Sequence, residues 1–473
     1  MGASRFLSFT VGTALAVFVP AILGAVDYGN WVVLRGIMGM LTGPTALGLV
    51  PVMAVHYVSR VVEGRRLEAM RLFKAAALLR LAVALPAVVI GCVMVWASPT
   101  LSRKAWFATW LAGSLLLRLA GNTLLLLLHG ERDYKRLAIA RVLQQSTVPA
   151  AIIPAYLVGG FNMVPLAAAA GDGLNALIFL GLVRRYLSWP RGWPQRSDWR
   201  VLAQFTGSMS FYSAGRRAFA NAVPFLMGIA GVGAAQIGYV GLGSRLAALI
   251  AGTLQQMSRP MMPSIRVVMR TRGIQAVAMW HSFTCRAGLV ICLAATGSFL
   301  LAGPLLVPLV WGEAYRGAVP IIAIILAGGV LNWVGANHSD MLAVAERAGG
   351  AAKAVFWMLS AFLTAFLFLV PAYAGRGTAF AITVGAGAFA ASAMIYAWRT
   401  VRCYLGLHVT WFPIILTVGT AFMSPHLHSA SSRIVATGLW CAGFMASVFV
   451  SRSLRMDEIR KVLNNVKAGA NDA

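Results

Sequence analysis

Long apolar segments separated by short polar gaps follow one another along the whole chain. A hydrocarbon core of about 30 Å requires roughly 20 apolar residues per helix, and most of the segments approach that length. The pattern therefore predicts an all-α polytopic membrane protein with about 14 transmembrane helices. The predicted helices are residues 6–25, 31–54, 75–96, 106–128, 137–158, 163–182, 207–229, 237–257, 283–301, 319–343, 354–370, 378–397, 411–423 and 434–450.

Basic residues mark one side of these predicted helices. The N-terminus, the even-numbered gaps and the tail hold most of the 40 Lys and Arg residues, whereas the odd-numbered gaps hold only Arg103, Lys104, Arg316, Arg376 and Arg433. Positively charged connections stay on the cytoplasmic side during insertion. We therefore expect a multi-pass protein of the bacterial inner (plasma) membrane with both termini in the cytoplasm.

Composition and motifs exclude several classes of protein. A hydrophobic fraction of 59% with 11% charged residues is not that of a soluble globule. The net charge of +27 is spaced as topology determinants, which argues against nucleic acid as a partner. The five Cys and seven His residues are dispersed without metal-ligand spacing, and there is no phosphate-binding loop. We expect no metal, no cofactor and no catalytic residues.

A basic, proline-containing connection over residues 184–200 divides the first six predicted helices from the next six. Because six is an even number, a repeat between the two sets would be related by an axis along the membrane normal. Residues 265–280 and 454–466 are predicted to lie on the membrane surface and to contact anionic lipids, and a solvated helical end is the alternative for 454–466. The predicted organisation is a six-helix lobe with its linker at 1–203, a second six-helix lobe at 204–405, two additional helices at 406–451 and a basic tail at 452–473.

Ionisable residues inside the predicted helices are the candidates for function. Arg118, Asp172, Arg216, Arg217 and Arg245 all lie several residues from a helix end. One Arg at the bilayer centre costs about 2.5 to 3.5 kcal/mol, so these residues should face protein or a water-filled cavity rather than lipid. One acid cannot neutralise four bases, and the sequence therefore predicts a cationic interior that attracts an anion. In the alternative interpretation, these arginines brace helix packing.

Asp172 and the seventh predicted helix carry more specific predictions. Asp172 is either a proton or sodium coupling site or a counterion to Arg118. On the seventh helix, Arg217 and Asn221 share a polar stripe because they are four residues apart, and Pro224 is expected to kink the helix beside it. Four residues nearer helix ends are expected to reach the interface: Arg35, Arg80, Arg286 and Asp340. In the alternative interpretation, Arg80 and Arg286 form a cytoplasmic vestibule that collects anionic head groups.

Short aromatic and glycine motifs at the predicted turns resemble those of one transporter family. The motifs are Asp27-Tyr28-Gly29, Asp133-Tyr134 with Arg136, Gly238-Tyr239 with Arg245, Pro260 with Pro263, Trp311-Gly312-Glu313-Ala314-Tyr315 with Pro320, and Tyr373 to Ala379. In order and spacing the chain resembles the polysaccharide (Wzx-like) flippases of the MOP exporter superfamily, which move O-antigen and exopolysaccharide repeat units. The first predicted helix carries no charge, whereas the related lipid II flippases place basic residues there, and this departure favours a polysaccharide-unit flippase.

The resemblance implies two six-helix bundles arranged as a V, which alternate between inward-open and outward-open forms. It also implies a polyprenyl-diphosphate-linked glycan as substrate, translocated for polysaccharide biosynthesis, with other polysaccharide-assembly membrane proteins as partners. A diphosphate carries negative charges that Arg can bind through two hydrogen bonds. The substrate-binding candidates are therefore Arg118, Arg216, Arg217, Arg245 and Asn221, and Asp172 is the candidate for ion coupling.

Two other functions remain as alternatives. A multidrug cation antiporter shares the implied fold, but it would need carboxylates and aromatic residues to bind a lipophilic cation. A membrane-embedded glycan polymerase or ligase would hold its catalytic residues on large outer loops, and the outer gaps here are short.

Overall fold

Helices make up nearly all of the backbone that the structure describes, and no strand occurs among those residues. The structure is a computed structural model, and it describes residues 2–43, 45, 49, 53–101, 103–187, 193–206, 208–258, 274–345, 347–401, 411–427 and 429–450. The predicted surface segment 454–466 and most of 265–280 lie outside these ranges. The chain divides into two compact units, Met1–Gly238 and Tyr239–Ala473.

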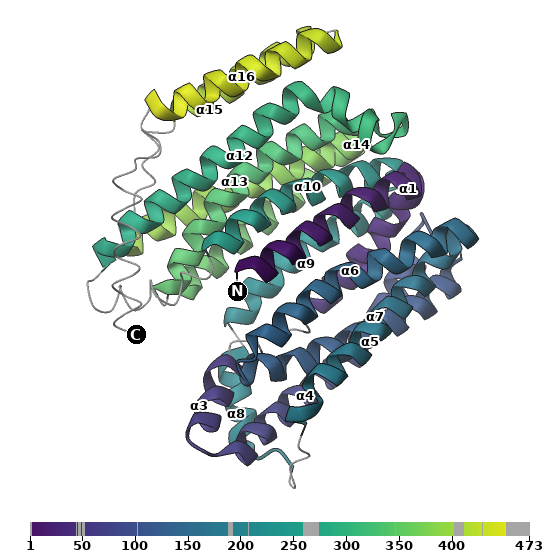
Figure 1. The fold of residues 1–473 in the computed structure, drawn as a ribbon, viewed down its shortest axis with the longest axis vertical. Helices are drawn as coiled ribbons and strands as arrows, with labels where there is room; N and C mark the ends of the chain where they lie inside the picture. The colour runs from purple at the N-terminus through teal and green to yellow at the C-terminus, as the bar shows by residue number, and fades with distance from the viewer. Residues whose placement is uncertain are drawn as a thin grey trace. The chain divides into compact units, whose positions relative to one another are not determined.

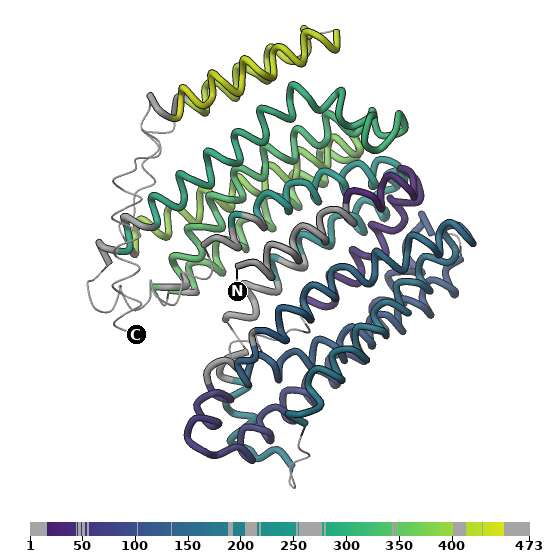
Figure 2. The backbone as a smooth tube through the Cα atoms, in the orientation of Figure 1, coloured from purple at the N-terminus to yellow at the C-terminus, as the bar shows by residue number. Residues whose placement is uncertain are grey.

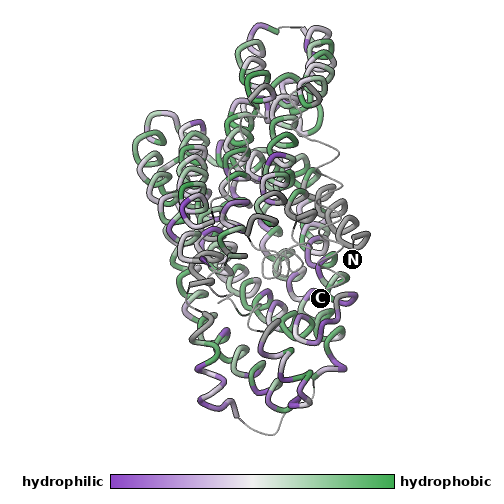
Figure 3. The backbone as a smooth tube through the Cα atoms, turned by 90° about the vertical axis from the view of Figure 1, so that its left-hand side faces the viewer, coloured by the Kyte–Doolittle hydropathy of each residue, from purple (hydrophilic) through white to green (hydrophobic). Residues whose placement is uncertain are grey.

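Among the described residues, eight helical segments are long and apolar enough to cross a membrane. Two of them, Lys135–Tyr186 and Gly349–Thr400, contain 52 residues each. At 1.5 Å per residue, either is long enough for two crossings. Hydrophobic residues predominate along the long helices (Figure 3), and many large apolar side chains are exposed, as lipid-facing positions require. A multi-pass membrane protein is confirmed, but the predicted count of about 14 helices is not.

Unit 1 contains a long N-terminal helix, four helices that pack side by side, and the helices that follow them (Figure 1). Its elements are α1 (Gly2–Thr42), a π-helix (Met53–Tyr57), α3 (Val58–Val62), α4 (Arg66–Ala97), α5 (Lys104–Gly130), α6 (Tyr134–Gly159), α7 (Val164–Val183), α8 (Arg196–Thr206), α9 (Ser208–Ile229) and the start of α10 (Ala234–Ser258). Helix α5 packs on α4 and α7, and α7 packs on α6, as the tube in Figure 2 shows. The sequence predicts two helices where α1 runs, and the helix is interrupted at Gly24, within the last turn of the first predicted helix, where a φ of 71° suits glycine.

Glycines let α1 approach its neighbours α9 and α10 closely. A Cβ atom on Gly29 would lie 1.8 Å from the carbonyl oxygen of Ala234, and one on Gly238 would lie 2.4 Å from that of Ala25. No real side chain tolerates such distances, so only glycine permits this packing. Because α9 packs against α1, unit 1 extends to Gly238, beyond residue 203. The division into two six-helix lobes stays a prediction.

Unit 2 contains the rest of α10, then α12 (Ile274–Trp311), α13 (Ala318–Val344), α14 (Ala348–Val401), α15 (Trp411–Met423) and α16 (Ala430–Val450). Helix α13 packs against α12 and α14, and α15 and α16 pack on α12. At the last contact, the indole of Trp440 lies against Gly297, where a Cβ atom would be 2.1 Å from the ring. The two C-terminal helices are therefore packed parts of unit 2.

The turn motifs of unit 2 lie where the sequence predicts them. Gly312, with φ of 89°, ends α12 before a short 3-10 helix (Glu313–Tyr315), and Ala374, with φ of 46°, interrupts α14. The hydroxyl of Tyr239 donates to the carbonyl of Ala314 at 2.6 Å, and its ring lies 5.9 Å from that of Tyr315. Two motifs that are far apart in the sequence thus hold α10 to the turn between α12 and α13.

We predict that Gly29→Ala destabilises the protein by about 1 to 3 kcal/mol, because the added methyl group overpacks a backbone contact. The measurement is the thermal unfolding temperature of the purified protein in detergent. Gly113→Ala is the matched control, since nothing lies within 4 Å of its Cβ position on α5. Equal unfolding temperatures for the two variants would contradict the close approach of α1 and α10.

Candidate functional site

A buried carboxylate connects α5 and α7 in the middle of unit 1. Asp172 on α7 is 3% exposed, and its Oδ1 atom lies 3.1 Å from Nε of Arg118 on α5. The hydroxyl of Ser114, one helical turn before Arg118, donates to the other carboxylate oxygen. Two of the predicted residues therefore meet, and Asp172 is a counterion to Arg118. The pairing neutralises one of the arginines that the sequence places in the interior.

Amide side chains continue this polar contact along the same helices. Ser114, Arg118 and Asn122 follow one another at four-residue steps on α5, and Asn122 accepts a hydrogen bond of 2.8 Å from Gln144 of α6. Asn175 on α7 is 4% exposed, and neither polar atom of its amide has a hydrogen-bond partner among the described residues. The sequence analysis missed these polar residues, although the four-residue spacing from Arg118 could have indicated Ser114 and Asn122.

We predict that Asp172→Asn destabilises unit 1 by about 3 kcal/mol, because it leaves the charge of Arg118 without its partner in a buried site. The double variant Arg118→Met/Asp172→Asn should recover most of that loss, since it removes both charges. Thermal unfolding in detergent measures both effects. A double variant as unstable as Asp172→Asn alone would show that the ion pair is not what the carboxylate stabilises.

The other predicted residues lie on helices α9 and α10. The side chain of Arg216 is half-buried on α9, and that of Arg245 is half-buried on α10, in unit 2. The side chain of Arg217 lies outside the described part of the structure. Asn221 faces α1, where a Cβ atom on Gly39 would lie 2.3 Å from its Oδ1 atom. Asn221 therefore contributes to the packing of α9 on α1, and its substrate-binding role stays a prediction.

Two further arginines are buried in long helices and contact backbone carbonyl groups. Arg80 on α4 is 5% exposed, and its Nε donates to the carbonyl of Thr45 at 3.2 Å. Arg286 on α12 is 7% exposed, and its Nε donates to the carbonyl of Ser282 at 3.4 Å. Both show the bracing contacts that the sequence analysis kept as an alternative for interior arginines.

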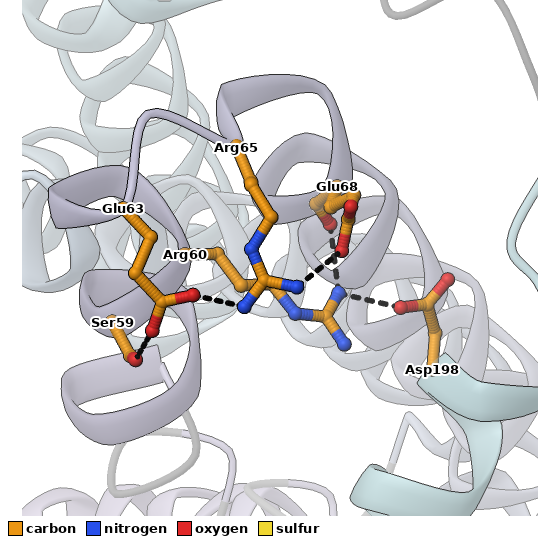
Figure 4. Close-up of polar contacts among 6 residues, drawn as sticks. All are labelled: Ser59, Arg60, Glu63, Arg65, Glu68 and Asp198. Atoms are coloured by element: carbon orange, nitrogen blue, oxygen red, sulfur yellow. Dashed lines mark hydrogen bonds and ion pairs between the residues drawn. The ribbon is translucent and has the colours of Figure 1, made fainter.

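A network of ion pairs lies at one end of unit 1, where several long helices begin or end. Arg60 pairs with the buried carboxylate of Asp198 at 2.6 Å and also donates to the carbonyl of Glu68 at 2.8 Å (Figure 4). Beside it, Arg65 pairs with Glu63 and Glu68. The network joins α8 to the turn between α3 and α4. The sequence analysis predicted neither helix α8 nor the buried position of Asp198.

A second group of contacts at this end centres on Asp133, which precedes α6. Burial alone would raise the pKa of this carboxyl group. Hydrogen bonds from the Arg136 amide and the Tyr186 hydroxyl, together with the charge of Arg185, outweigh burial and hold the pKa below its ordinary value of 3.8. Arg185 lies 2.6 Å from the carboxylate. The ionised form of Asp133 thus stabilises the fold.

Because the folded-state pKa of Asp133 is lowered, its contribution is complete above the unfolded-state pKa near 3.9 and disappears as the pH falls through the lower folded value. We predict that Asp133→Asn, which retains an N-cap, lowers the unfolding temperature between pH 5 and 8 and that this difference shrinks below about pH 4. Glu313→Gln is the control, because its exposed ion pair with Arg316 contributes little. A difference that stays constant down to pH 3 would contradict the role of the charge.

Within the described residues, no group of three or more His, Cys, Asp or Glu side chains could hold a metal ion. His281 and His338, on α12 and α13, approach with ring centroids 4.7 Å apart, but they form only a pair. The expectation that the chain binds no metal stays a prediction.

Comparisons with known proteins identify the fold. No family model and no curated protein matches the sequence. Among solved structures, the lipid II flippase MurJ in an inward closed conformation aligns with a TM-score of 0.71 and 10% identity, over 96% of this chain and 97% of that chain. An inward-facing multidrug resistance transporter of the MATE family aligns with a TM-score of 0.67 and 16% identity, over 84% of this chain and 94% of that chain. This chain has the fold of the MOP superfamily transporters.

A third structure with this fold is described by the polarity of its binding pocket. A MOP superfamily transporter from Pyrococcus furiosus, whose binding pocket is described as having reversed polarity, aligns with a TM-score of 0.60 and 16% identity, over 85% of this chain and 94% of that chain. At such low identities, only the fold is shared. The alignment with MurJ leaves out 4% of this chain, which is fewer residues than the 13 of α15 and the 21 of α16 together contain, so it extends into at least one of the two C-terminal helices.

Proposed function

We propose that this protein flips polyprenyl-diphosphate-linked oligosaccharide units from the cytoplasmic to the outer leaflet of the inner membrane by alternating access. The observation that carries the proposal is the excess of arginine over acid within the apolar helices. Asp172 already pairs with Arg118, and Arg80, Arg216, Arg245 and Arg286 are four further arginines within the long helices.

The charge of the substrate fits this interior. A diphosphate carries at least two negative charges, and a guanidinium group binds two of its oxygens in one plane. Arg216 and Arg245 are the first candidates, because their side chains are half-buried and therefore still reachable by a ligand. Arg217 stays a candidate from its place in the sequence. If Arg118 binds substrate, its guanidinium group must contact the diphosphate and the carboxylate of Asp172 at the same time.

The neighbour MurJ supports a lipid-linked substrate. It is named a lipid II flippase, and it matches nearly the whole chain, whereas the MATE structures match 84 or 85% of it. The sequence motifs separately resemble polysaccharide flippases. We infer that the translocated glycan serves polysaccharide biosynthesis and that other membrane proteins of polysaccharide assembly are partners.

The two alternative functions fit the site less well. A multidrug cation antiporter would need a carboxylate to attract its substrate, and Asp172 is engaged by Arg118 and Ser114. A glycan polymerase or ligase would need room for an active site on a loop. The described connections between helices at Gly160–Met163, Glu313–Tyr315 and Ser424–His426 are short 3-10 turns.

The test is transbilayer movement of a fluorescent polyprenyl-diphosphate sugar in liposomes that contain the purified protein. We predict that Arg216→Ala and Arg245→Ala each slow flipping about tenfold or more, since a charge-assisted hydrogen bond contributes about 1.5 to 3 kcal/mol. The double variant Arg216→Ala/Arg217→Ala should be slower still. Arg399→Ala is the matched control, because Arg399 is exposed in the last turn of α14.

Each variant must unfold at the temperature of the wild type before its rate is interpreted. Undiminished flipping by folded Arg216 and Arg245 variants would assign these arginines to helix packing. No flipping by the wild type would instead favour one of the alternative functions.

A further inference from the structure

Three contacts pin α8 and the residues before it to the end of unit 1. The amine of Lys74 on α4 lies 5.0 Å from the centre of the Trp193 ring, and Arg60 pairs with Asp198 on α8. Leu202, one turn after Asp198, is 1% exposed and belongs to the apolar core that α4, α5 and α7 build. One face of α8 is thus fully used in packing, and the helix is a fixed part of this surface.

The opposite face of α8 combines basic and aromatic side chains. Arg196, Trp199 and Arg200 are exposed, with 38% of Trp199 accessible. The pair between Arg60 and Asp198 places this helix beside the turn between α3 and α4 (Figure 4), where Val62 is 74% and Leu67 is 68% exposed. Exposed apolar side chains therefore lie next to exposed arginines on two neighbouring elements of one unit.

The acids at this end do not balance the arginines of α8. Glu63 and Glu68 pair with Arg65, Glu131 pairs with Arg66, and Asp198 pairs with Arg60. Within the part of the chain that the structure describes, Arg196 and Arg200 form no ion pair. The surface of α8 thus keeps a positive charge available for an external anion.

The position of this surface indicates which anion it meets. Arg66 begins an apolar segment long enough to cross a membrane, so the turn before it and α8 beside it lie at a boundary between apolar and polar surroundings. Tryptophan, leucine and arginine together are the side chains that interfacial helices use, because the apolar parts enter the acyl region while the cations meet phosphate. If the partner were a soluble acidic protein, its carboxylates would explain the exposed arginines but not the exposed apolar side chains of Leu67 and Trp199.

We propose that α8 and the turn between α3 and α4 form a binding site for an anionic phospholipid. Arg196 and Arg200 bind its phosphodiester, and Trp199 with Leu67 contacts its acyl region. The bound lipid stabilises unit 1, because it bridges the segment after α7 and the loop between α3 and α4 on the surface of the helices. This inference does not depend on the identity of the transported substrate.

The test compares phosphatidylglycerol with phosphatidylcholine of the same acyl chains, titrated into the purified full chain in detergent. Unfolding temperature and native mass spectrometry report bound lipid, and neither requires flipping. We predict that phosphatidylglycerol raises the unfolding temperature of the wild type more than phosphatidylcholine does. The double variant Arg196→Gln/Arg200→Gln should need about tenfold more phosphatidylglycerol for the same effect. Its unfolding temperature in phosphatidylcholine should equal that of the wild type.

The matched control is Arg316→Gln/Arg376→Gln, which removes two exposed positive charges from unit 2 and should leave the response to phosphatidylglycerol unchanged. Trp199→Ala should also weaken lipid binding, because the acyl contact is lost. Three results would overturn the proposal: equal responses of the wild type to the two lipids, equal losses in both double variants, or inorganic phosphate that replaces phosphatidylglycerol at constant ionic strength.

Discussion

An ionisable group carried into an apolar helix bundle must meet an opposite charge, a backbone carbonyl group or water, because no other environment offsets its lost hydration. The described arginines follow this constraint. Arg118 meets the buried carboxylate of Asp172, while Arg80 and Arg286 meet carbonyl groups. These contacts decide which faces of α4, α5, α7 and α12 turn inward. The same constraint links structure to the proposed function, since an anionic substrate is one more group that could offset the charge of an interior arginine.

The helices of unit 1 are also held by two kinds of contact that act in different places. Along their length, glycine allows α1 to approach α9 and α10 so closely that carbonyl groups occupy the space of a side chain. At one end, ion pairs join segments that are far apart in the sequence, such as Arg60 with Asp198 and Asp133 with Arg185. Apolar packing alone does not favour one arrangement of helices whose surfaces are all hydrophobic. The close backbone contacts and the ion pairs favour the observed arrangement.

The fold and the arginines within the helices together reduce the number of functions that fit this protein. A likeness to MATE and MurJ structures at 10 to 16% identity establishes the architecture but does not by itself determine the cargo. The argument for a diphosphate-linked substrate therefore rests on arginine, which suits phosphate oxygens, and on the scarcity of acids inside the helices. Asp172, for example, already contacts Arg118 and Ser114, and its role in ion coupling stays a prediction.

From the sequence alone, apolar runs of membrane-spanning length establish an all-helical membrane protein, and Gly312 and Ala374 interrupt the helices where turns are predicted. These features are local, since they depend on hydropathy and on backbone conformations of single residues. The sequence left open whether Asp172 contacts Arg118, and it did not indicate that Asp198 anchors α8. Those outcomes belong to the tertiary structure, because the partners are 54 and 138 residues apart and pair only when helix packing brings them within hydrogen-bond distance.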